Sequence, residues 1–280
     1  MQDCARNSMV WLLRAFAFSL LSACIGCAQW ASTVRGPVGE IVSEGLVDCF
    51  QPHLKTPDGK PAYCETSGVV IHGDTLIMAS DKPVPGSSSV FQFKHRAGIA
   101  DPGSRTHWKI PVLLAAQKIE DMAVTPDGKH VMAITAFDRW REDHGELDGY
   151  NTLLIWPVGQ PTLAKVVMPQ TRGQHTSSLP LRRQLQKHLG HPYFKIEGLA
   201  ILHGRLLFGV RELGASQDHF DYKFLVLEVS YNMDGEGVVQ VGDDLRSVID
   251  FSPQMVDGLA GGLGVSGLAV SADSGVLFLL

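Results

Sequence analysis

The chain has 280 residues, of which 45% are hydrophobic and 19% charged, so it has enough apolar material for a core and too little charge for a disordered protein. Its 24 basic and 29 acidic residues give a formal charge of −5 without a basic block, which argues against a nucleic-acid-binding protein. The 29 glycines and 15 prolines separate short runs of Val, Ile, Leu and Phe. This pattern predicts an all-β fold with many turns.

Residues 1–23 have the pattern of an export signal. Within Met9–Ala23 one arginine, Arg14, precedes the apolar run Ala15–Ala23. This run is too short for a membrane-spanning helix, which needs about 20 apolar residues. The eight residues before Met9 do not resemble the start of such a signal, so either Met1 or Met9 could be the true start. With either start, the signal segment predicts an exported bacterial protein.

The apolar run ends in Leu21-Ser22-Ala23-Cys24, which resembles the bacterial lipobox. This resemblance implies that Cys24 carries a lipid, which would be the chain's only attachment to a membrane, as in an outer-membrane lipoprotein of a Gram-negative bacterium. The alternative is ordinary cleavage near Gly26-Cys27-Ala28, which would release a soluble periplasmic protein. Both alternatives place the protein in the periplasm or cell envelope.

Export permits disulfides, and Cys49 and Cys64 flank a turn-rich loop. We expect them to form a disulfide that stabilises the fold by about 3 kcal/mol through loop closure. Cys27 lies near the anchor and is expected to have no structural partner. The one C-x-x-C pair, Cys24 to Cys27, spans the proposed cleavage site, which argues against a zinc ribbon or thioredoxin-type chemistry.

A short phrase recurs four times along the chain. Each copy is followed by a polar turn and a second apolar run, which predicts a β-hairpin. The copies are Ser67–Ile71, Glu120–Val124, Glu197–Ile201 and Ser266–Val270.

Two more strands are expected after each of the first three hairpins, giving four-stranded blades of a β-propeller. They are Ser89–Phe93 and His107–Leu113, then Asn151–Val158 and Ala164–Met168, then Lys223–Ser230 and Val238–Val241. The repeats are 53, 77 and 69 residues apart, more than the roughly 40 to 45 of a compact blade, so we expect long loops between the strands. One loop, Ser178–Leu189, has the leucine spacing of a short helix.

Residues 49–280 would thus form about three and a half blades, an incomplete ring. Residues 24–48 would form a linker with one closing strand near Glu40–Val47. A propeller usually has four to eight blades, so either the sequence is truncated or a fragment, or the ring is completed irregularly; we expect truncation.

The third repeat carries a family resemblance. Lys195–Ile201, followed by Leu206–Glu212, resembles an uncharacterised bacterial propeller family whose repeats contain I-E-G-L-A and then G-L-R, and it is similar to the esterase-like phytase propellers. Val210 and Glu212 depart from the first family, which usually has Leu and Gly there. The resemblance covers about Thr66–Leu280 and implies a propeller, while the first family has no assigned chemistry.

Candidate site residues gather at the expected mouth of the central channel, where the repeats place Ser67, Glu120, Glu197 and Ser266 at equivalent positions. A polar ligand could be bound there, with Arg211 holding a carboxylate or phosphate, by Glu120, Glu197, Arg211, Asp81 and Glu212. Oxygen ligands for calcium could come from Glu65, Asp121 and Asp138.

Two functional hypotheses and one structural interpretation follow. The first hypothesis is a binding module for a small polar ligand or an envelope protein, and the alternative is a calcium-dependent phosphoesterase of phytase type. The carboxylates could instead cap backbone amides, and an acidic side chain beside Arg211 could be its salt-bridge partner. Only one well-placed arginine is available for phosphate, which weakens the phosphoesterase hypothesis.

Other motifs are weak. No G-x-S-x-G elbow, phosphate-binding loop or dinucleotide fingerprint is present, and His188 and His191 are separated by a helix stop. The charged segments Asp138–Asp148 and Gln217–Tyr222 are either solvated loops or recognition loops.

Overall fold

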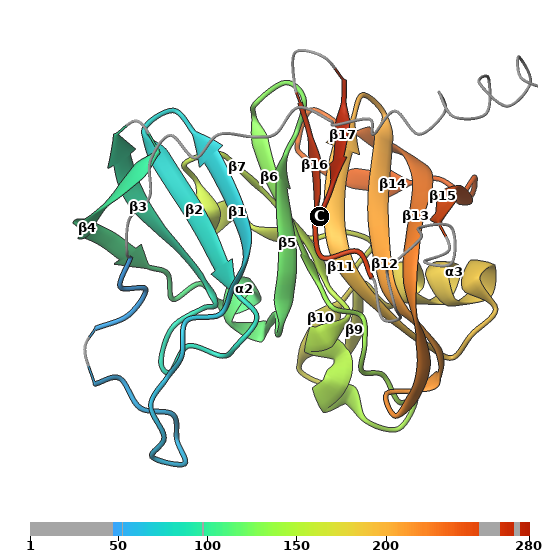
Figure 1. The fold of residues 1–280 in the computed structure, drawn as a ribbon, viewed down its shortest axis with the longest axis horizontal. Helices are drawn as coiled ribbons and strands as arrows, with labels where there is room; N and C mark the ends of the chain where they lie inside the picture. Colours follow the sequence, from blue (N-terminus) through green and yellow to red (C-terminus); the bar gives the residue numbers. More distant parts are fainter. Residues whose placement is uncertain (1–46, 52, 97, 252–263, 272–274) are drawn as a thin grey trace, which may run out of the picture. The chain divides into compact units, whose positions relative to one another are not determined.

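The computed structural model describes residues 47–51, 53–96, 98–251, 264–271 and 275–280. Over these residues the chain consists mostly of antiparallel β-sheets, as the composition predicts (Figure 1). The signal segment, Cys24, Cys27 and all of the closing strand except Val47 lie outside the described residues. No helix in the described part of the chain is long and apolar enough to cross a membrane.

Two four-stranded sheets come first in the chain, each with its strands in sequence order. The first contains β1 (Thr66–His72), β2 (Thr75–Ser80), β3 (Val90–Arg96) and β4 (Ile99–His107). The second contains β5 (Ile119–Val124), β6 (His130–Thr135), β7 (Leu153–Pro157) and β8 (Lys165–Val166). Two-residue turns such as His72 to Thr75 need a left-handed residue, which Gly73 supplies with φ of 58°.

The third sheet is larger. It contains β11 (Tyr193–Leu202), β12 (Arg205–Ser216) and β13 (His219–Met233), and both β14 (Val239–Val241) and β15 (Arg246–Phe251) pair with β13. A last hairpin joins β16 (Leu268–Val270) to β17 (Leu277–Leu279). The hairpin expected at each of the four repeats is therefore present.

Short elements connect the sheets: the helices α2 (Pro111–Ala115) and α3 (Leu179–Leu189), the 3₁₀ turns η1 (Gly145–Tyr150) and η2 (Pro161–Leu163), and the hairpin of β9 (Gln170–Arg172) and β10 (His175–Ser177). α3 confirms the helix expected at Ser178–Leu189.

Two strand predictions need correction. The strand expected at His107–Leu113 is wrong: β4 ends at His107 and α2 follows, because Pro111 starts a helical turn that buries Leu113. The strand at Val238–Val241 exists as β14, but β14 pairs only with the far end of β13. The prediction missed β15, which pairs with β13 over Phe224 to Glu228.

The first strands of successive sheets lie side by side, β1 with β5, β5 with β11, and β11 with β16. Small residues allow this approach: a Cβ added to Gly198 would come within 2.5 Å of Leu268 Cγ, and one added to Gly68 within 3.1 Å of the Met122 nitrogen. Glycine is thus required by packing at Gly198 and favoured at Gly68, whereas a Cβ at Gly267 would make only ordinary contacts and the second copy has Asp121 at this position. Apolar cores fill the spaces between neighbouring sheets, for example where Trp108 packs edge-on against Trp156.

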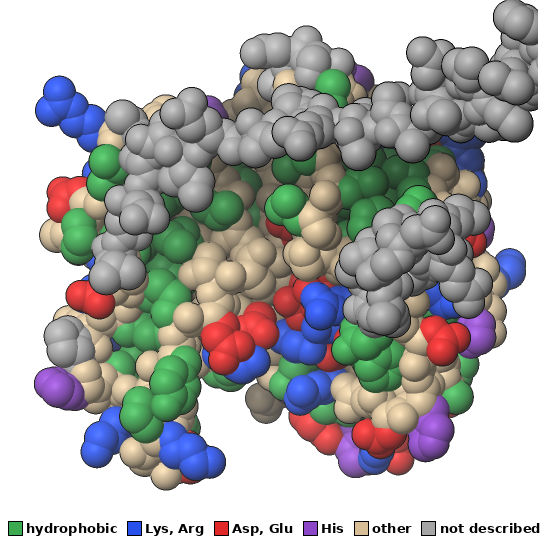
Figure 2. Space-filling model, in the orientation of Figure 1, with side chains coloured by type: hydrophobic (Ala, Val, Ile, Leu, Met, Phe, Trp, Pro, Cys, Tyr) green, Lys and Arg blue, Asp and Glu red, His purple; other side chains and the backbone are tan. Residues whose placement is uncertain are grey.

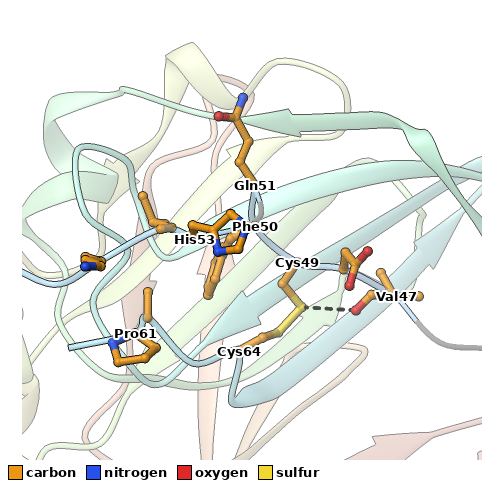
Figure 3. A pocket seen from close by; sticks show the side chains of 11 residues that line it. Val47, Cys49, Phe50, Gln51, His53, Pro61 and Cys64 are labelled. Atoms are coloured by element: carbon orange, nitrogen blue, oxygen red, sulfur yellow. Dashed lines mark hydrogen bonds between the residues drawn. A yellow bond between two sulfur atoms is a disulfide. The ribbon is translucent and has the colours of Figure 1, made fainter.

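The predicted disulfide between Cys49 and Cys64 is confirmed (Figure 3). The loop that it closes covers one face of the first sheet, where Phe50 packs against Phe91. β4 holds the loop by its backbone, because Arg105 donates hydrogen bonds to the carbonyls of Asp48 and Phe50 at 2.7 and 2.8 Å. A cavity of about 390 Å³ lies within this loop region.

Candidate functional site

β5 and β11 enter their sheets through the same local structure. A Lys-Ile-Glu triplet lies near the start of each strand: Lys118–Glu120 spans the first residue of β5, and Lys195–Glu197 begins at the third residue of β11. The isoleucine of each triplet is fully buried. The pairing register shifts at Glu120 and at Glu197, and it shifts at the equivalent Ser67 in β1. A β-bulge of this kind redirects a side chain away from the regular pleat. The three positions aligned by sequence are therefore structurally equivalent.

The bulges bring alternating charges together. Lys118 forms an ion pair with Asp138 and lies 3.6 Å from Glu120 Oε1, and Lys195 Nζ lies 3.5 Å from the same oxygen. Lys195 also pairs with Glu197, whose other oxygen lies 3.4 Å from an Arg211 nitrogen. We call Lys118, Glu120, Asp138, Lys195, Glu197 and Arg211 the charged cluster. Figure 2 shows acidic and basic side chains gathered on the face of the molecule below β5 and β11.

Glu120 is a buried acid of the cluster, and it lies between Lys118 and Lys195. Its side chain is 3% exposed, and its Oε1 atom makes no hydrogen bond among the described residues. Burial and the nearby Glu197 raise the pKa of Glu120 to about 7, against the effect of Lys195 and Lys118. Burial alone would lower the pKa of Lys195, but Glu120 and Glu197 hold that pKa above its usual value. The cluster therefore holds a carboxyl that can change protonation near neutral pH.

The backbone around the cluster is strained. Lys118 and Phe137 both lie in the left-handed region, with φ of 59° and 55°, although neither is glycine. A hydrogen bond from the Ala136 nitrogen to the Lys118 carbonyl, 3.0 Å long, joins the two segments. This conformation presents Lys118 and Asp138 to each other, and strained backbone is concentrated at functional sites in proteins.

Other predicted ligand residues lie at the edge of the cluster. Asp81 follows β2, pairs with Lys82 at 3.1 Å, and contributes to the raised pKa of Glu120. Glu212 accepts a hydrogen bond from the Tyr193 hydroxyl, and burial together with that bond raises the pKa of Tyr193. Glu65 is exposed and pairs with Lys82 at 3.0 Å.

Asp121 has a different position from its neighbour Glu120. Its carboxylate accepts hydrogen bonds from the backbone nitrogens of Met122, Leu199 and Leu268, at 2.8, 2.7 and 3.2 Å. These nitrogens belong to β5, β11 and β16, so one side chain joins three sheets. Burial raises the pKa of Asp121 to about 7, although the three backbone donors act in the opposite direction. The side chain lines an otherwise largely apolar cavity of about 610 Å³ between β1, β5, β11 and β16.

The three acids considered for calcium have separate partners: Glu65 binds Lys82, Asp121 binds backbone nitrogens, and Asp138 binds Lys118. Within the described ranges, no group of three or more His, Cys, Asp or Glu side chains is arranged to hold a metal ion. The calcium hypothesis stays a prediction.

The two charged segments meet next to the cluster. The tip of the β12–β13 hairpin reaches the loop that begins at Asp138, where Gln217 Nε2 donates to the Asp138 carbonyl at 3.2 Å. The loop is not fully solvated, because Asp138 and Asp148 at its two ends are both buried. Asp148 is bound by Arg172, with 2.7 Å between Nε and Oδ2.

Sequence reasoning missed both lysines of the cluster. A signal was available, because Lys-Ile-Glu occurs at Lys118–Glu120 and again at Lys195–Glu197, each time just before the apolar part of the repeated phrase. Lys118 and Lys195 occupy equivalent positions in two repeats, as Glu120 and Glu197 do, and this equivalence predicts that the lysines belong to the same site.

Comparisons with known proteins give little further information. No protein-family model and no curated protein matches the chain. A solved structure described as the extracellular domain of a one-component system from B. thetaiotaomicron is similar, with a TM-score of 0.35 and 12% sequence identity. The match covers 80% of this chain, and the chain spans 27% of that chain's length.

Proposed function

We propose that the chain is an exported β-propeller module of the cell envelope that binds a small polar ligand at the charged cluster. Three antiparallel meanders, a further hairpin and four aligned repeats, with their first strands side by side, support the propeller architecture. The Cys49–Cys64 disulfide supports an oxidising location, in agreement with the apolar segment at residues 15–23.

Glu120 carries the assignment of the site. A carboxyl group that is 3% exposed, with an oxygen that makes no hydrogen bond among the described residues, is costly to maintain for stability alone. It lies on a bulge, between two lysines, beside strained backbone. Buried groups with perturbed pKa values are concentrated at binding and catalytic sites.

A ligand panel tests this proposal. The thermal unfolding midpoint (Tm) is measured for the wild type, for Glu120→Gln, and for the control Asp143→Asn, whose side chain is 81% exposed. The panel contains neutral sugars, amino acids, citrate, phosphate and calcium chloride. At least one class should raise the Tm of the wild type and of the control, but not that of Glu120→Gln. No shift with any class, or equal shifts in all three proteins, would contradict the proposal.

The calcium arm also tests the phosphoesterase alternative. The described residues provide no observation that favours this alternative over binding. A calcium-dependent Tm shift together with hydrolysis of a phosphoester would establish it.

Lipid anchoring through Cys24 is part of the proposal and has its own test. Cys24→Ala should move the protein from the membrane fraction to the soluble fraction. Membrane association retained by that variant would exclude the lipobox as the anchor.

A further inference from the structure

We propose that the ligand of the charged cluster is a neutral, hydroxyl-rich molecule, a saccharide or similar polyol. This inference rests on the proposed function and specifies the chemistry of its ligand. It follows from the alternating charges, from the polar atoms left without hydrogen bonds, and from an aromatic row beside them.

Four of the buried side-chain atoms that make no hydrogen bond in the described part of the chain lie in the charged cluster or at its edge, and one of them, Glu120 Oε1, has only the two lysine nitrogens at 3.5 and 3.6 Å near it. Three acidic side chains each have a buried oxygen that makes no hydrogen bond within the described part of the chain: Asp81 Oδ1, Glu120 Oε1 and Asp138 Oδ1. On the donor side, Arg211 Nε makes no hydrogen bond in the described part of the chain. Buried polar atoms are normally paired, so a ligand that both donates and accepts hydrogen bonds fits these groups.

The alternating charges disfavour simple ions as ligands. An anion drawn to Lys195 would approach Glu120 and Glu197, and a cation drawn to Glu120 would meet two lysine ammonium groups 3.5 and 3.6 Å from its Oε1. A hydroxyl group carries no net charge, donates one hydrogen bond and accepts two. Several hydroxyls on one ring can therefore bind carboxylates and cationic groups at the same time.

An aromatic row runs along the Arg211 side of the cluster. Tyr193 lies against Phe220, with ring centroids 5.7 Å apart, and Phe220 packs edge-on against Tyr222 at 5.3 Å. Arg211 lies over the Tyr222 ring, 5.7 Å from its centroid, and Tyr222 is 39% exposed. A sugar ring has an apolar face of C–H groups that can lie on such a ring while its hydroxyls reach the charges.

A titration with named sugars tests the ligand class. Glucose, galactose, mannose, N-acetylglucosamine, maltose and cellobiose are titrated into the full chain, and binding is followed by calorimetry. Parallel titrations use glutamate, lysine, citrate, phosphate and calcium chloride. We expect binding by at least one sugar, weakened about tenfold or more by Asp138→Asn through loss of a charged hydrogen-bond acceptor.

Two further variants separate ligand contact from folding. Tyr222→Ala should weaken sugar binding, whereas Tyr63→Ala, which removes a tyrosine 66% exposed on the disulfide loop, should leave it unchanged. The Tm of each variant without ligand shows whether it is folded. If Asp138→Asn does not fold, the tyrosine pair decides the outcome.

The outcomes distinguish this inference from the proposed function. If only an amino acid or an anion binds, and Glu120→Gln abolishes that binding, the cluster is a site but the saccharide inference is wrong. Sugar binding that none of the cluster or Tyr222 variants alters would also overturn the inference. If no compound binds, both proposals fail.

Discussion

Replacing Asp121 by alanine is expected to weaken the junction of three sheets. The carboxylate accepts hydrogen bonds from the backbone nitrogens of Met122, Leu199 and Leu268, all of which lose their acceptor in Asp121→Ala. An unsatisfied buried donor costs about 1 to 2 kcal/mol where some water can enter, so three donors correspond to about 3 to 6 kcal/mol. The adjoining cavity of about 610 Å³ gives water that access.

Asp121→Asn provides a graded comparison. Leu199 and Leu268 both donate to Oδ2, and Met122 donates to Oδ1. An asparagine oxygen at the Oδ2 position keeps two of these bonds and turns its NH₂ group toward the Met122 nitrogen. The expected loss is smaller than for alanine, about 1 to 3 kcal/mol at low pH. It should shrink as the pH rises toward 7, because burial raises the pKa of Asp121 to about 7 and asparagine avoids the cost of burying a charge.

The assay is urea unfolding at pH 7 followed by tryptophan fluorescence, with the disulfide intact. Asp143→Ala serves as the control, because its exposed carboxylate lies 3.7 Å from His144 and should change stability by less than about 0.5 kcal/mol. If Asp121→Ala is no more destabilising than this control, the carboxylate does not join the sheets as described.

Three further predictions concern pH, the disulfide and the cluster. Burial raises the folded-state pKa of Glu120 from 4.5 to about 7. The Glu120 side chain therefore makes its full contribution to the unfolding free energy below about pH 4.5, and this contribution is lost as the pH rises through 7. Glu120→Gln should therefore gain stability relative to the wild type between pH 5 and pH 8 in urea unfolding, and parallel curves would contradict this. Reducing Cys49–Cys64, which are 15 residues apart, should lower the unfolding free energy by about 3 kcal/mol, and a reduced protein of unchanged stability would contradict the loop-closure argument. Removing one partner of the buried ion pair, as in Lys118→Met, should cost about 3 kcal/mol, and Lys118→Met combined with Asp138→Leu should recover most of that loss. A double-variant loss equal to the sum of the two single losses would show that the two groups are not coupled.

The repeat was the strongest structural signal in the sequence, because each hairpin combines a small residue, an apolar run and a polar turn. α3 was equally predictable from its leucines and from Gly190, which ends it with φ of 72°. Periodicity could not distinguish a strand from a short helix at Pro111–Ala115, and Arg246–Phe251 has too many exposed positions to stand out as a strand.

The acidic half of the site was predictable by aligning the repeats, which put Glu120 and Glu197 at equivalent positions. The basic half depends on the bulges in β5 and β11, which shift the register next to both glutamates. A bulge depends on packing between sheets, so the sequence alone did not show that Lys118 and Lys195 would meet around Glu120. The same packing gives Asp121 and Glu120 different surroundings, although they are adjacent in the chain: Asp121 binds backbone nitrogens, and Glu120 lies in the charged cluster.

The most direct test of the account is calorimetric titration of the wild type and of Glu120→Gln with the compound that gives the largest Tm shift in the panel. The account predicts saturable binding by the wild type and about tenfold weaker or no binding by Glu120→Gln, with Asp143→Asn equal to the wild type. Equal affinity in all three proteins would contradict the assignment of the charged cluster as the binding site.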